Sequence, residues 1–210
     1  SYPVIMGFIV FSHLIYNNFA RENRLKLQIK KQFEHYLAPD MVKKLQDNPS
    51  LLKLGGETRE LTFLFCDIRG FTPISEKYKS DPQGLTKLIN SFLTPMTDII
   101  LRSGGTIDKY MGDCLMAFWN APLDCPNHAE MAVRSAMEIE LLTEQMNKEL
   151  KNAGYDLPPV VIGTGINTGP CIVGNMGSEA RFDYSVVGDA VNLGARLEVQ
   201  TRTFDTPIIL

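Results

Sequence analysis

The feature that most constrains the fold is an apolar segment that ends in a carboxylate. Residues 61–72 read LTFLFCDIRGFT, so a run of mostly apolar residues leads directly into Asp67. A continuous apolar run of this length is typical of a strand that is buried on both faces. A carboxylate beside such a strand is costly to desolvate unless a cation or hydrogen-bond donors compensate it. Asp67 is therefore the first candidate functional residue.

The composition is that of a globular chain with one substantial core. The chain has 210 residues, of which 44% are hydrophobic and 21% are charged, which is ordinary for a folded domain. The formal net charge of −3 argues against a general nucleic-acid binder, because no basic excess exists to neutralise phosphates. None of the four cysteines (Cys66, Cys114, Cys125 and Cys171) lies in a CxxC pair, and the histidines are not spaced near them as zinc ligands. We therefore expect reduced, mostly buried thiols.

The N-terminal segment differs from the rest. Residues 2–16 carry no charged side chain, and basic residues follow them from Arg21 onward. A signal peptide would have its positive residues before the apolar stretch, and the segment is shorter than the roughly 20 residues that span a bilayer. We expect residues 1–19 to be the C-terminal part of a membrane helix, with the rest of the chain membrane-anchored in the cytoplasm. The alternative is a buried helix of a soluble domain.

Residues 20–56 predict a helical linker between this segment and a larger domain. Leu25, Ile29 and Phe33 recur at helical spacing, and Pro39 with Asp40 marks the start of a second helix. The turn-rich sequence DNPSLLKLGGE then follows. We therefore expect a catalytic domain at residues 57–210.

In that domain, predicted strands and helices alternate, which favours an α+β fold with helices packed on a mixed sheet. We expect a strand at 60–67, a helix with Thr72 as N-cap and Pro73 at its first position, a helix at 84–102, a hairpin within 104–119 that turns at Met111-Gly112, a helix at 127–151, a strand–turn–strand at 159–177 that turns at Thr168-Gly169, a strand at 181–187, a helix that starts at Gly188-Asp189, and a final strand at 206–210.

Asp113 is a plausible partner for Asp67. It follows the tight turn of the predicted hairpin, and adjacent strands lie about 4.8 Å apart, so two carboxylates at neighbouring strand ends can reach the same cations. Two carboxylate ligands, with water and substrate phosphates in the other positions, suit Mg²⁺. Two ions about 3.5–4 Å apart suit an in-line displacement at phosphorus. The alternative is that each aspartate caps a turn.

Backbone amides offer a possible phosphate site after the first strand. Gly70 lies between that strand and a predicted helix N-terminus, followed by Phe71 and Thr72. Free N–H groups at this place can hold phosphate oxygens, and the helix dipole favours negative charge. Most turns of this kind bind nothing, so the motif alone is weak.

Three further polar residues lie near these segments. Lys109 precedes Asp113 by four residues and is by default a solvated surface lysine. Asn192 and Arg196 are spaced i, i+4 on the last predicted helix and share one face. Such a pair can steady a ribose and neutralise charge on a phosphoryl group, or it can be an ordinary surface pair.

Four segments together resemble the catalytic domain of class III nucleotidyl cyclases. They are FLFCDIRGFT, GGTIDKYMGDCLMAFW, GINTGPCIVGNMG and YSVVGDAVNLGARLE, in this order. The resemblance covers about residues 57–210, without the family's C-terminal end. It implies a ferredoxin-like, palm-like mixed sheet with helices packed on it.

The resemblance also implies a role for each candidate residue. Asp67 and Asp113 match the aspartates that bind two Mg²⁺ or Mn²⁺ ions, and Ile68 would lend a backbone carbonyl to a metal. Lys109 and Ser185 match the residues that contact the adenine. Asn192 matches the residue that orients the ribose, and Arg196 matches the residue that stabilises the transition state. In that family, one subunit supplies the metal aspartates and its partner supplies the other contacts. This chain carries both halves, which implies a homodimer with two equivalent sites.

The base-contacting residues favour ATP over GTP. Guanylyl cyclases of this family typically have Glu at the Lys109 position and Cys at the Ser185 position, whereas Ser185 resembles a subclass with Thr. Lysine donates a hydrogen bond, which adenine N1 can accept. We expect an adenylyl cyclase that forms 3′,5′-cyclic AMP and pyrophosphate from ATP. The alternatives are a guanylyl cyclase or a catalytically idle, dimerising regulatory module; a diguanylate cyclase is disfavoured, because YMGDCL lacks the second acidic residue of a GG[DE]EF hairpin.

Overall fold

The computed structural model describes residues 2–34, 37–49, 56–154, 158–178 and 181–210. It divides into two compact units, residues 1–52 and 53–210. The predicted turn-rich linker at 47–57 falls largely on residues 50–55, which lie outside the described residues.

The first unit consists of two helices, α1 (Tyr2–Phe33) and α2 (Pro39–Asp47). Ile29 and Phe33 of the predicted apolar stripe are buried, whereas Leu25 is more exposed. The side-chain amide of Gln46 donates a hydrogen bond to the carbonyl of Lys26 at 2.9 Å, which ties α2 to α1. The segment with the predicted membrane span forms the first part of α1. In the described part of the chain, no helix combines the length and apolar character of a membrane span, and the membrane-anchored, cytoplasmic location stays a prediction.

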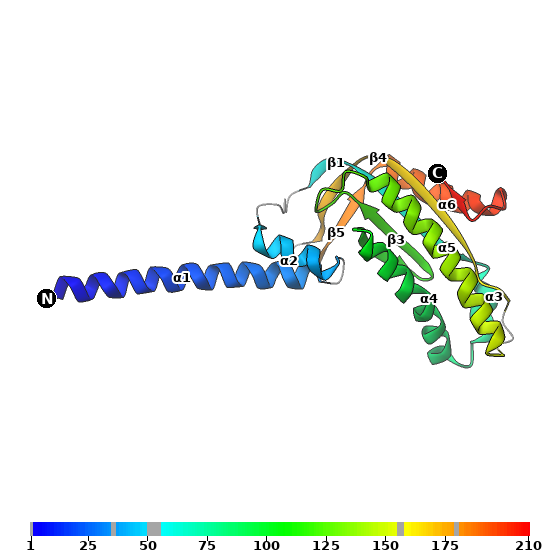
Figure 1. Ribbon diagram of the computed structural model, residues 1–210, viewed down its shortest axis with the longest axis horizontal. Coiled ribbons are helices and arrows are strands. Elements are labelled where there is room, and N and C mark those ends of the chain that lie inside the picture. The colour runs from blue at the N-terminus through cyan, green and yellow to red at the C-terminus, as the bar shows by residue number, and fades with distance from the viewer. Residues whose placement is uncertain (1, 35–36, 50–55, 155–157, 179–180) are drawn as a thin grey trace. The chain divides into compact units, whose positions relative to one another are not determined.

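The second unit is a six-stranded sheet with helices on both faces (Figure 1). The strands run in the order β2-β3-β1-β4-β5, and β6 pairs with β4. All pairs are antiparallel except β4 with β6, so the predicted mixed sheet is confirmed. The elements are β1 (Glu57–Arg69), α3 (Phe71–Lys77), α4 (Pro82–Arg102), β2 (Thr106–Met111), β3 (Cys114–Trp119), α5 (His128–Asn152), β4 (Val161–Ser178), β5 (Arg181–Val187), α6 (Asp189–Thr203) and β6 (Ile208–Ile209).

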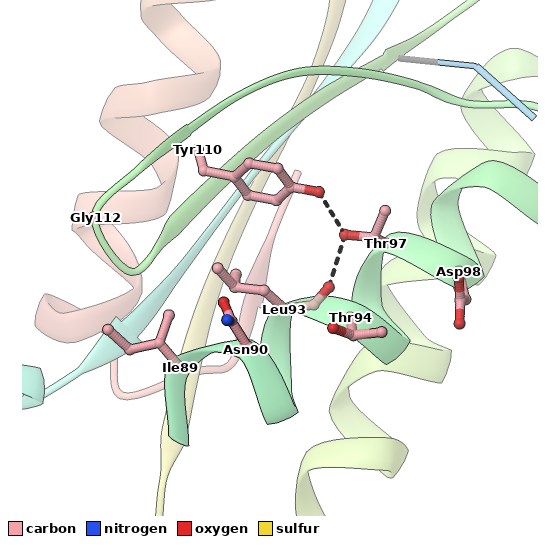
Figure 2. Close-up of a pocket in the computed structure, with 8 residues that line it drawn as sticks. All are labelled: Ile89, Asn90, Leu93, Thr94, Thr97, Asp98, Tyr110 and Gly112. Atoms are coloured by element: carbon pink, nitrogen blue, oxygen red, sulfur yellow. Dashed lines mark hydrogen bonds between the residues drawn. The ribbon is translucent and has the colours of Figure 1, made fainter. Parts of the chain in front are cut away.

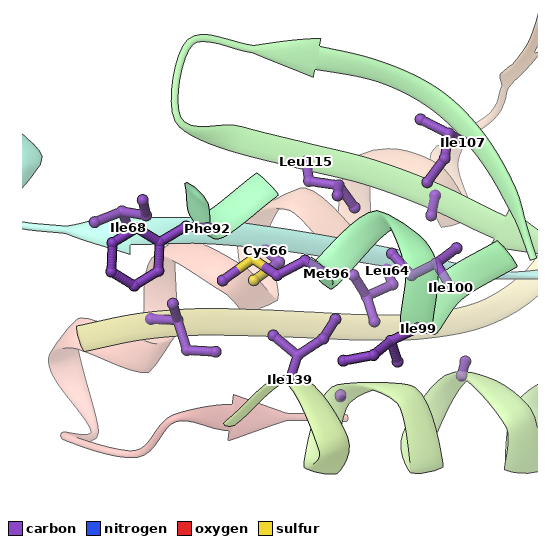
Figure 3. Packing of buried hydrophobic residues seen from close by; sticks show 14 of the residues in the cluster. Leu64, Cys66, Ile68, Phe92, Met96, Ile99, Ile100, Ile107, Leu115 and Ile139 are labelled. Atoms are coloured by element: carbon purple, nitrogen blue, oxygen red, sulfur yellow. The ribbon is translucent and has the colours of Figure 1, made fainter. Parts of the chain in front are cut away.

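The central strand β1 is buried on both faces, as its apolar run predicts. Leu64, Cys66 and Ile68 point into the main core, where Phe92 and Met96 of α4 are also buried (Figure 3). Side chains alternate along a strand, and Phe65 accordingly lies on the other face, near Gly194 of α6. Asp67 is two residues further along β1, so it shares the α6 face with Phe65 and lies outside the main core. All four cysteines are free thiols, as expected.

The predicted turn at Thr168-Gly169 is wrong, because β4 is one continuous strand. Its first part pairs with β1 from Val161 to Val173, and its second part pairs with β5 from Ile172 to Ser178. The glycines in this strand make room for α6 instead of turning the chain. A Cβ on Gly165 would lie 2.2 Å from the backbone nitrogen of Glu198, closer than any real Cβ contact.

Two predicted local boundaries are also wrong by a residue or so. The β2–β3 hairpin turns at Gly112-Asp113, since Met111 pairs with Cys114 and Gly112 adopts a positive φ of 68°. Helix α3 begins at Phe71, and its N-cap is Gly70, also in the left-handed region, where glycine is favoured. Thr72 is therefore not an N-cap but a residue of the first helical turn.

Candidate active site

The two predicted metal-binding aspartates are brought together by the register between β1 and β3. The last β1–β3 pair is Cys66 with Leu115, so the next position on β1, Asp67, comes beside Cys114 and hence beside Asp113. Burial raises the pKa of the Asp113 carboxyl, and the nearby Asp67 carboxylate raises it further. This repulsion between two half-buried acids is what a shared cation would relieve.

Arg202 of α6 supplies a positive charge at this place. Its Nη2 lies 2.6 Å from Oδ2 of Asp67, the side chain of which is 17% exposed. Arg69, at the end of β1, donates from its Nη2 to the carbonyls of Thr201 and Thr206, which holds the end of α6 near Asp67. The charge that compensates Asp67 within this chain is therefore a guanidinium, which the sequence reasoning did not identify.

Glu198 is a third acid behind the pair. It is 7% exposed, and its Oε1 has no hydrogen-bond partner among the described residues. Burial raises the pKa of Glu198, as does Asp67, whereas Arg202 and Arg69 lower it. The sequence signal for both missed residues is their spacing: Glu198 and Arg202 are i, i+4 on α6, the arrangement of an intrahelical ion pair.

The donor set fits a hard divalent cation. The part of the chain that the structure describes contains no group of three or more histidine, cysteine, aspartate or glutamate side chains that can hold a metal, so the protein offers the two carboxylates of Asp67 and Asp113. A pair of carboxylates, completed by water and phosphate oxygens, is the set that Mg²⁺ prefers. The side chain of Ile68 belongs to the main core, and a metal contact from its carbonyl stays a prediction.

The two predicted base contacts meet across the sheet. Lys109 Nζ lies 3.5 Å from Ser185 Oγ, although β2 and β5 are at opposite ends of the strand order. Asp108 joins them: its carboxylate accepts from Ser185 Oγ at 3.0 and 2.9 Å, and Lys109 Nζ lies 3.2 Å from it. Sequence reasoning missed Asp108; the available signal was an acidic residue directly before Lys109 in a segment otherwise predicted to be a strand.

Asn192 and Arg196 lie on α6 and are exposed. Arg196 Nε donates to the carbonyl of Asn192 at 3.3 Å, so the predicted i, i+4 relationship holds. Arg202 is six positions after Arg196 on α6, which places the two side chains about 120° apart around the helix axis. Arg196 therefore points in a different direction from the side chain that contacts Asp67.

The predicted phosphate-binding residues follow β1 directly. Gly70, Phe71 and Thr72 form the cap and first residues of α3, and a Cβ on Gly70 would meet nothing within 4 Å. The carbonyl of Thr72 accepts a hydrogen bond from Ser75 Oγ at 2.8 Å. The backbone at Gly70 is therefore open, and its role in phosphate binding stays a prediction.

A separate cavity of about 420 Å³ lies between α4 and the β2–β3 hairpin (Figure 2). It is lined by Ile89, Asn90, Leu93, Thr94, Thr97, Asp98, Tyr110 and Gly112. Thr97 Oγ1 donates to the Leu93 carbonyl and lies 2.7 Å from the Tyr110 hydroxyl. None of the predicted site residues lines this cavity.

Comparison with known proteins defines the class to which this fold and site belong. The family model described as the adenylate and guanylate cyclase catalytic domain matches residues 56–204. The chain therefore belongs to this family, and the predicted resemblance is confirmed.

Individual relatives include both kinds of cyclase. The chain is 36% identical to an adenylate cyclase of Anabaena cylindrica over 154 residues, which are 73% of this chain and 30% of that protein. The crystal structure of the adenylyl cyclase CyaB from P. aeruginosa is 39% identical, with a TM-score of 0.65 over 70% of this chain and 74% of that one. That of the guanylyl cyclase Cya2 is 41% identical, with a TM-score of 0.63 over 69% and 72%. The chain thus spans under a third of the curated relative's length.

Proposed function

We propose that this chain is the catalytic domain of an adenylyl cyclase, which converts ATP into 3′,5′-cyclic AMP and pyrophosphate. The observation that carries the proposal is the cluster of Lys109 and Ser185 in the same unit as the Asp67–Asp113 pair. A lysine beside a hydroxyl suits the N1 acceptor and exocyclic amine of adenine. The similarity to named adenylate cyclases supports the same substrate.

Each residue has a defined task in this reaction. Lys109 and Ser185 orient the base, Asn192 orients the ribose, and the amides of Gly70, Phe71 and Thr72 hold phosphate oxygens. The ribose 3′-oxygen attacks the α-phosphorus in line as pyrophosphate departs. Two Mg²⁺ or Mn²⁺ ions bound to Asp67 and Asp113 would acidify the 3′-hydroxyl and stabilise the leaving group. Arg196 counters negative charge that accumulates at the α-phosphorus.

We propose that two copies of the chain share each site. Asn192 and Arg196 are exposed on α6, and in the same chain Asp67 is contacted by Arg202 instead. A second copy that presents its own α6 would bring these residues to the first copy's aspartates. A closed symmetric dimer then has two equivalent sites.

The similarity to Cya2 favours a second candidate, a guanylyl cyclase. Incubation of the purified chain with ATP or GTP and Mn²⁺, followed by chromatography of the products, separates the two. We expect cyclic AMP as the main product, and Asp67→Asn to lower its formation by about a thousandfold. The exposed Asp124, which pairs with Arg59, provides a matched Asp→Asn control that should keep activity. Cyclic GMP as the main product would overturn the proposal. Formation of neither cyclic nucleotide would favour a regulatory module.

A further inference from the structure

Asp108 is a buried carboxylate at an irregular point of β2. The β2–β3 register shifts between Ile107, opposite Ala117, and Lys109, opposite Met116. Asp108 is therefore the extra residue of a β-bulge, a feature that redirects side chains and is common next to active sites. It is 3% exposed, whereas the side chain of the adjacent Lys109 is 49% exposed. The bulge therefore places the Asp108 carboxylate inside the fold and the Lys109 ammonium group near the surface.

The surroundings of Asp108 supply donors from two strands. Ser185 Oγ lies 3.0 and 2.9 Å from its two oxygens, Lys109 Nζ lies 3.2 Å away, and the backbone of Val186 also bonds to it. Burial has the larger effect and raises the pKa of Asp108 above its ordinary value, and these donors offset part of that rise. A carboxylate held by a lysine, a hydroxyl and a backbone N–H is an acceptor only.

The direction of the hydrogen bond at Ser185 follows from this. A serine hydroxyl has one proton and two acceptor lone pairs. Because Asp108 can only accept, the Ser185 proton points toward Asp108. The lone pairs of Ser185 Oγ are then left for Lys109, whose Nζ lies 3.5 Å away, and for a ligand. Toward a bound base, Ser185 is an acceptor.

We propose that Asp108 is a specificity-determining residue that fixes the Ser185 hydroxyl as an acceptor and so selects a 6-amino purine over a 6-oxo purine. The inference rests on the proposed function, because it concerns how that site reads its base. The 6-amino group of adenine donates a hydrogen bond to such an acceptor. The 6-oxygen of guanine or hypoxanthine is itself an acceptor, so it forms no hydrogen bond with Ser185 Oγ and is repelled by it. Asp108 acts through Ser185 and needs no contact with the nucleotide.

Substitution of Asp108 tests the proposal. The amide of Asp108→Asn can donate to Ser185 as well as accept from it, so the hydroxyl can reverse. We expect the ratio of kcat/KM for ATP to that for GTP to fall about fivefold to tenfold, the scale of one hydrogen bond. A merely structural role would lower both values together and leave the ratio unchanged, which would overturn the inference. Asp124→Asn is the matched control and should keep the wild-type ratio.

A double-mutant cycle shows whether Asp108 acts through Ser185. In a Ser185→Ala background, Asp108→Asn should not lower the ratio further. An equal fall with and without the Ser185 hydroxyl would overturn the assigned route.

A ligand series gives a test that does not depend on the folding of any variant. Binding of ATP, purine riboside triphosphate and ITP to the wild-type chain is measured by calorimetry in the presence of Ca²⁺. We expect affinity to fall from ATP to purine riboside triphosphate, which keeps the N1 acceptor and loses only the donor at C6. It should fall again for ITP, which has an acceptor at C6 and a proton on N1. If cyclic AMP is the product yet ITP binds as tightly as ATP, this inference fails while the proposed function stands; if only cyclic GMP forms, the proposed function fails.

Discussion

The Nη2 atom of Arg202 lies 2.6 Å from the Asp67 carboxylate. A cation that binds Asp67 must compete with this guanidinium. Arg202 has a second partner available four residues earlier on α6, the buried Glu198, whose Oε1 has no hydrogen-bond partner among the described residues. This spacing favours an intrahelical ion pair once Asp67 is occupied.

We expect Arg202→Gln to tighten the binding of Mn²⁺ by about twofold to fivefold, because the lost ion pair is half exposed and worth at most about 1 kcal/mol. Titration with detection of free Mn²⁺ by electron paramagnetic resonance measures the affinity directly. Arg134→Gln is the matched control, since Arg134 forms an exposed i, i+4 pair with Glu130 on α5. Unchanged or weaker Mn²⁺ binding in Arg202→Gln would show that the guanidinium does not compete with the metal.

Cys114 reports on the charge of the aspartate pair. Burial raises the pKa of its thiol to about 12, and the carboxylates of Asp67 and Asp113 contribute in the same direction. Mg²⁺ bound to these acids removes their negative charge, so the pKa should fall and the thiolate fraction at a fixed pH near 8 should rise. We expect faster alkylation of Cys114 by iodoacetamide when Mg²⁺ is added, measured for each cysteine by mass spectrometry.

Cys171 is the internal control for this measurement. The pKa of its thiol is raised to about 11 by burial alone, so Mg²⁺ should leave its alkylation rate unchanged. Equal acceleration at both cysteines would point to a general opening of the fold and would contradict the assignment of the cation to Asp67 and Asp113.

Sharing of the site between two copies is tested by complementation. Asp67→Asn and Arg196→Ala should each be inactive as homodimers, because both sites of each dimer lack one group. In an equimolar mixture, half of the dimers are mixed, and each mixed dimer has one intact site, so about a quarter of the wild-type activity should return. The measurement is cyclic AMP formation against total chain concentration. No recovery in mixtures shown to exchange subunits would place the whole site within one chain.

The close approach of β4 and α6 predicts a large effect at Gly165. A Cβ there would lie 2.2 Å from the Glu198 backbone nitrogen and 2.5 Å from the Gly194 carbonyl, and neither backbone atom can move without shifting the helix. We expect Gly165→Ala to lower the free energy of unfolding by about 3 kcal/mol, measured by thermal or denaturant unfolding. Gly7→Ala, where nothing lies within 4 Å, should not lower the melting temperature.

The sequence predicts the strands and helices well and their interruptions poorly. The apolar run of β1 and the helical periodicity of α4 and α5 are signals summed over many residues. The turn expected at Thr168-Gly169 relied on a single glycine, and a glycine is equally required where a helix packs closely on a strand, as at Gly165. The distinction depends on α6, which is distant in sequence, so local turn chemistry cannot make it.

The candidate site shows the same division. Asp67, Asp113, Lys109 and Ser185 lie in the family's motifs, so the sequence predicts them as site residues. Asp108 and Arg202 were not, because their roles depend on contacts between elements: Asp108 meets Ser185 only because a bulge redirects it, and Arg202 meets Asp67 across 135 positions of sequence.

The contact between Asp108 and Ser185 joins strands at the two ends of the sheet order and residues 77 positions apart. Under the proposed function, nucleotide preference therefore depends on two separate stretches of chain that must match. A chimaera of two cyclases with its junction between those stretches would take the Asp108 position from one parent and the Ser185 position from the other. Recombination at such a junction can preserve the fold and still change which nucleotide the site prefers.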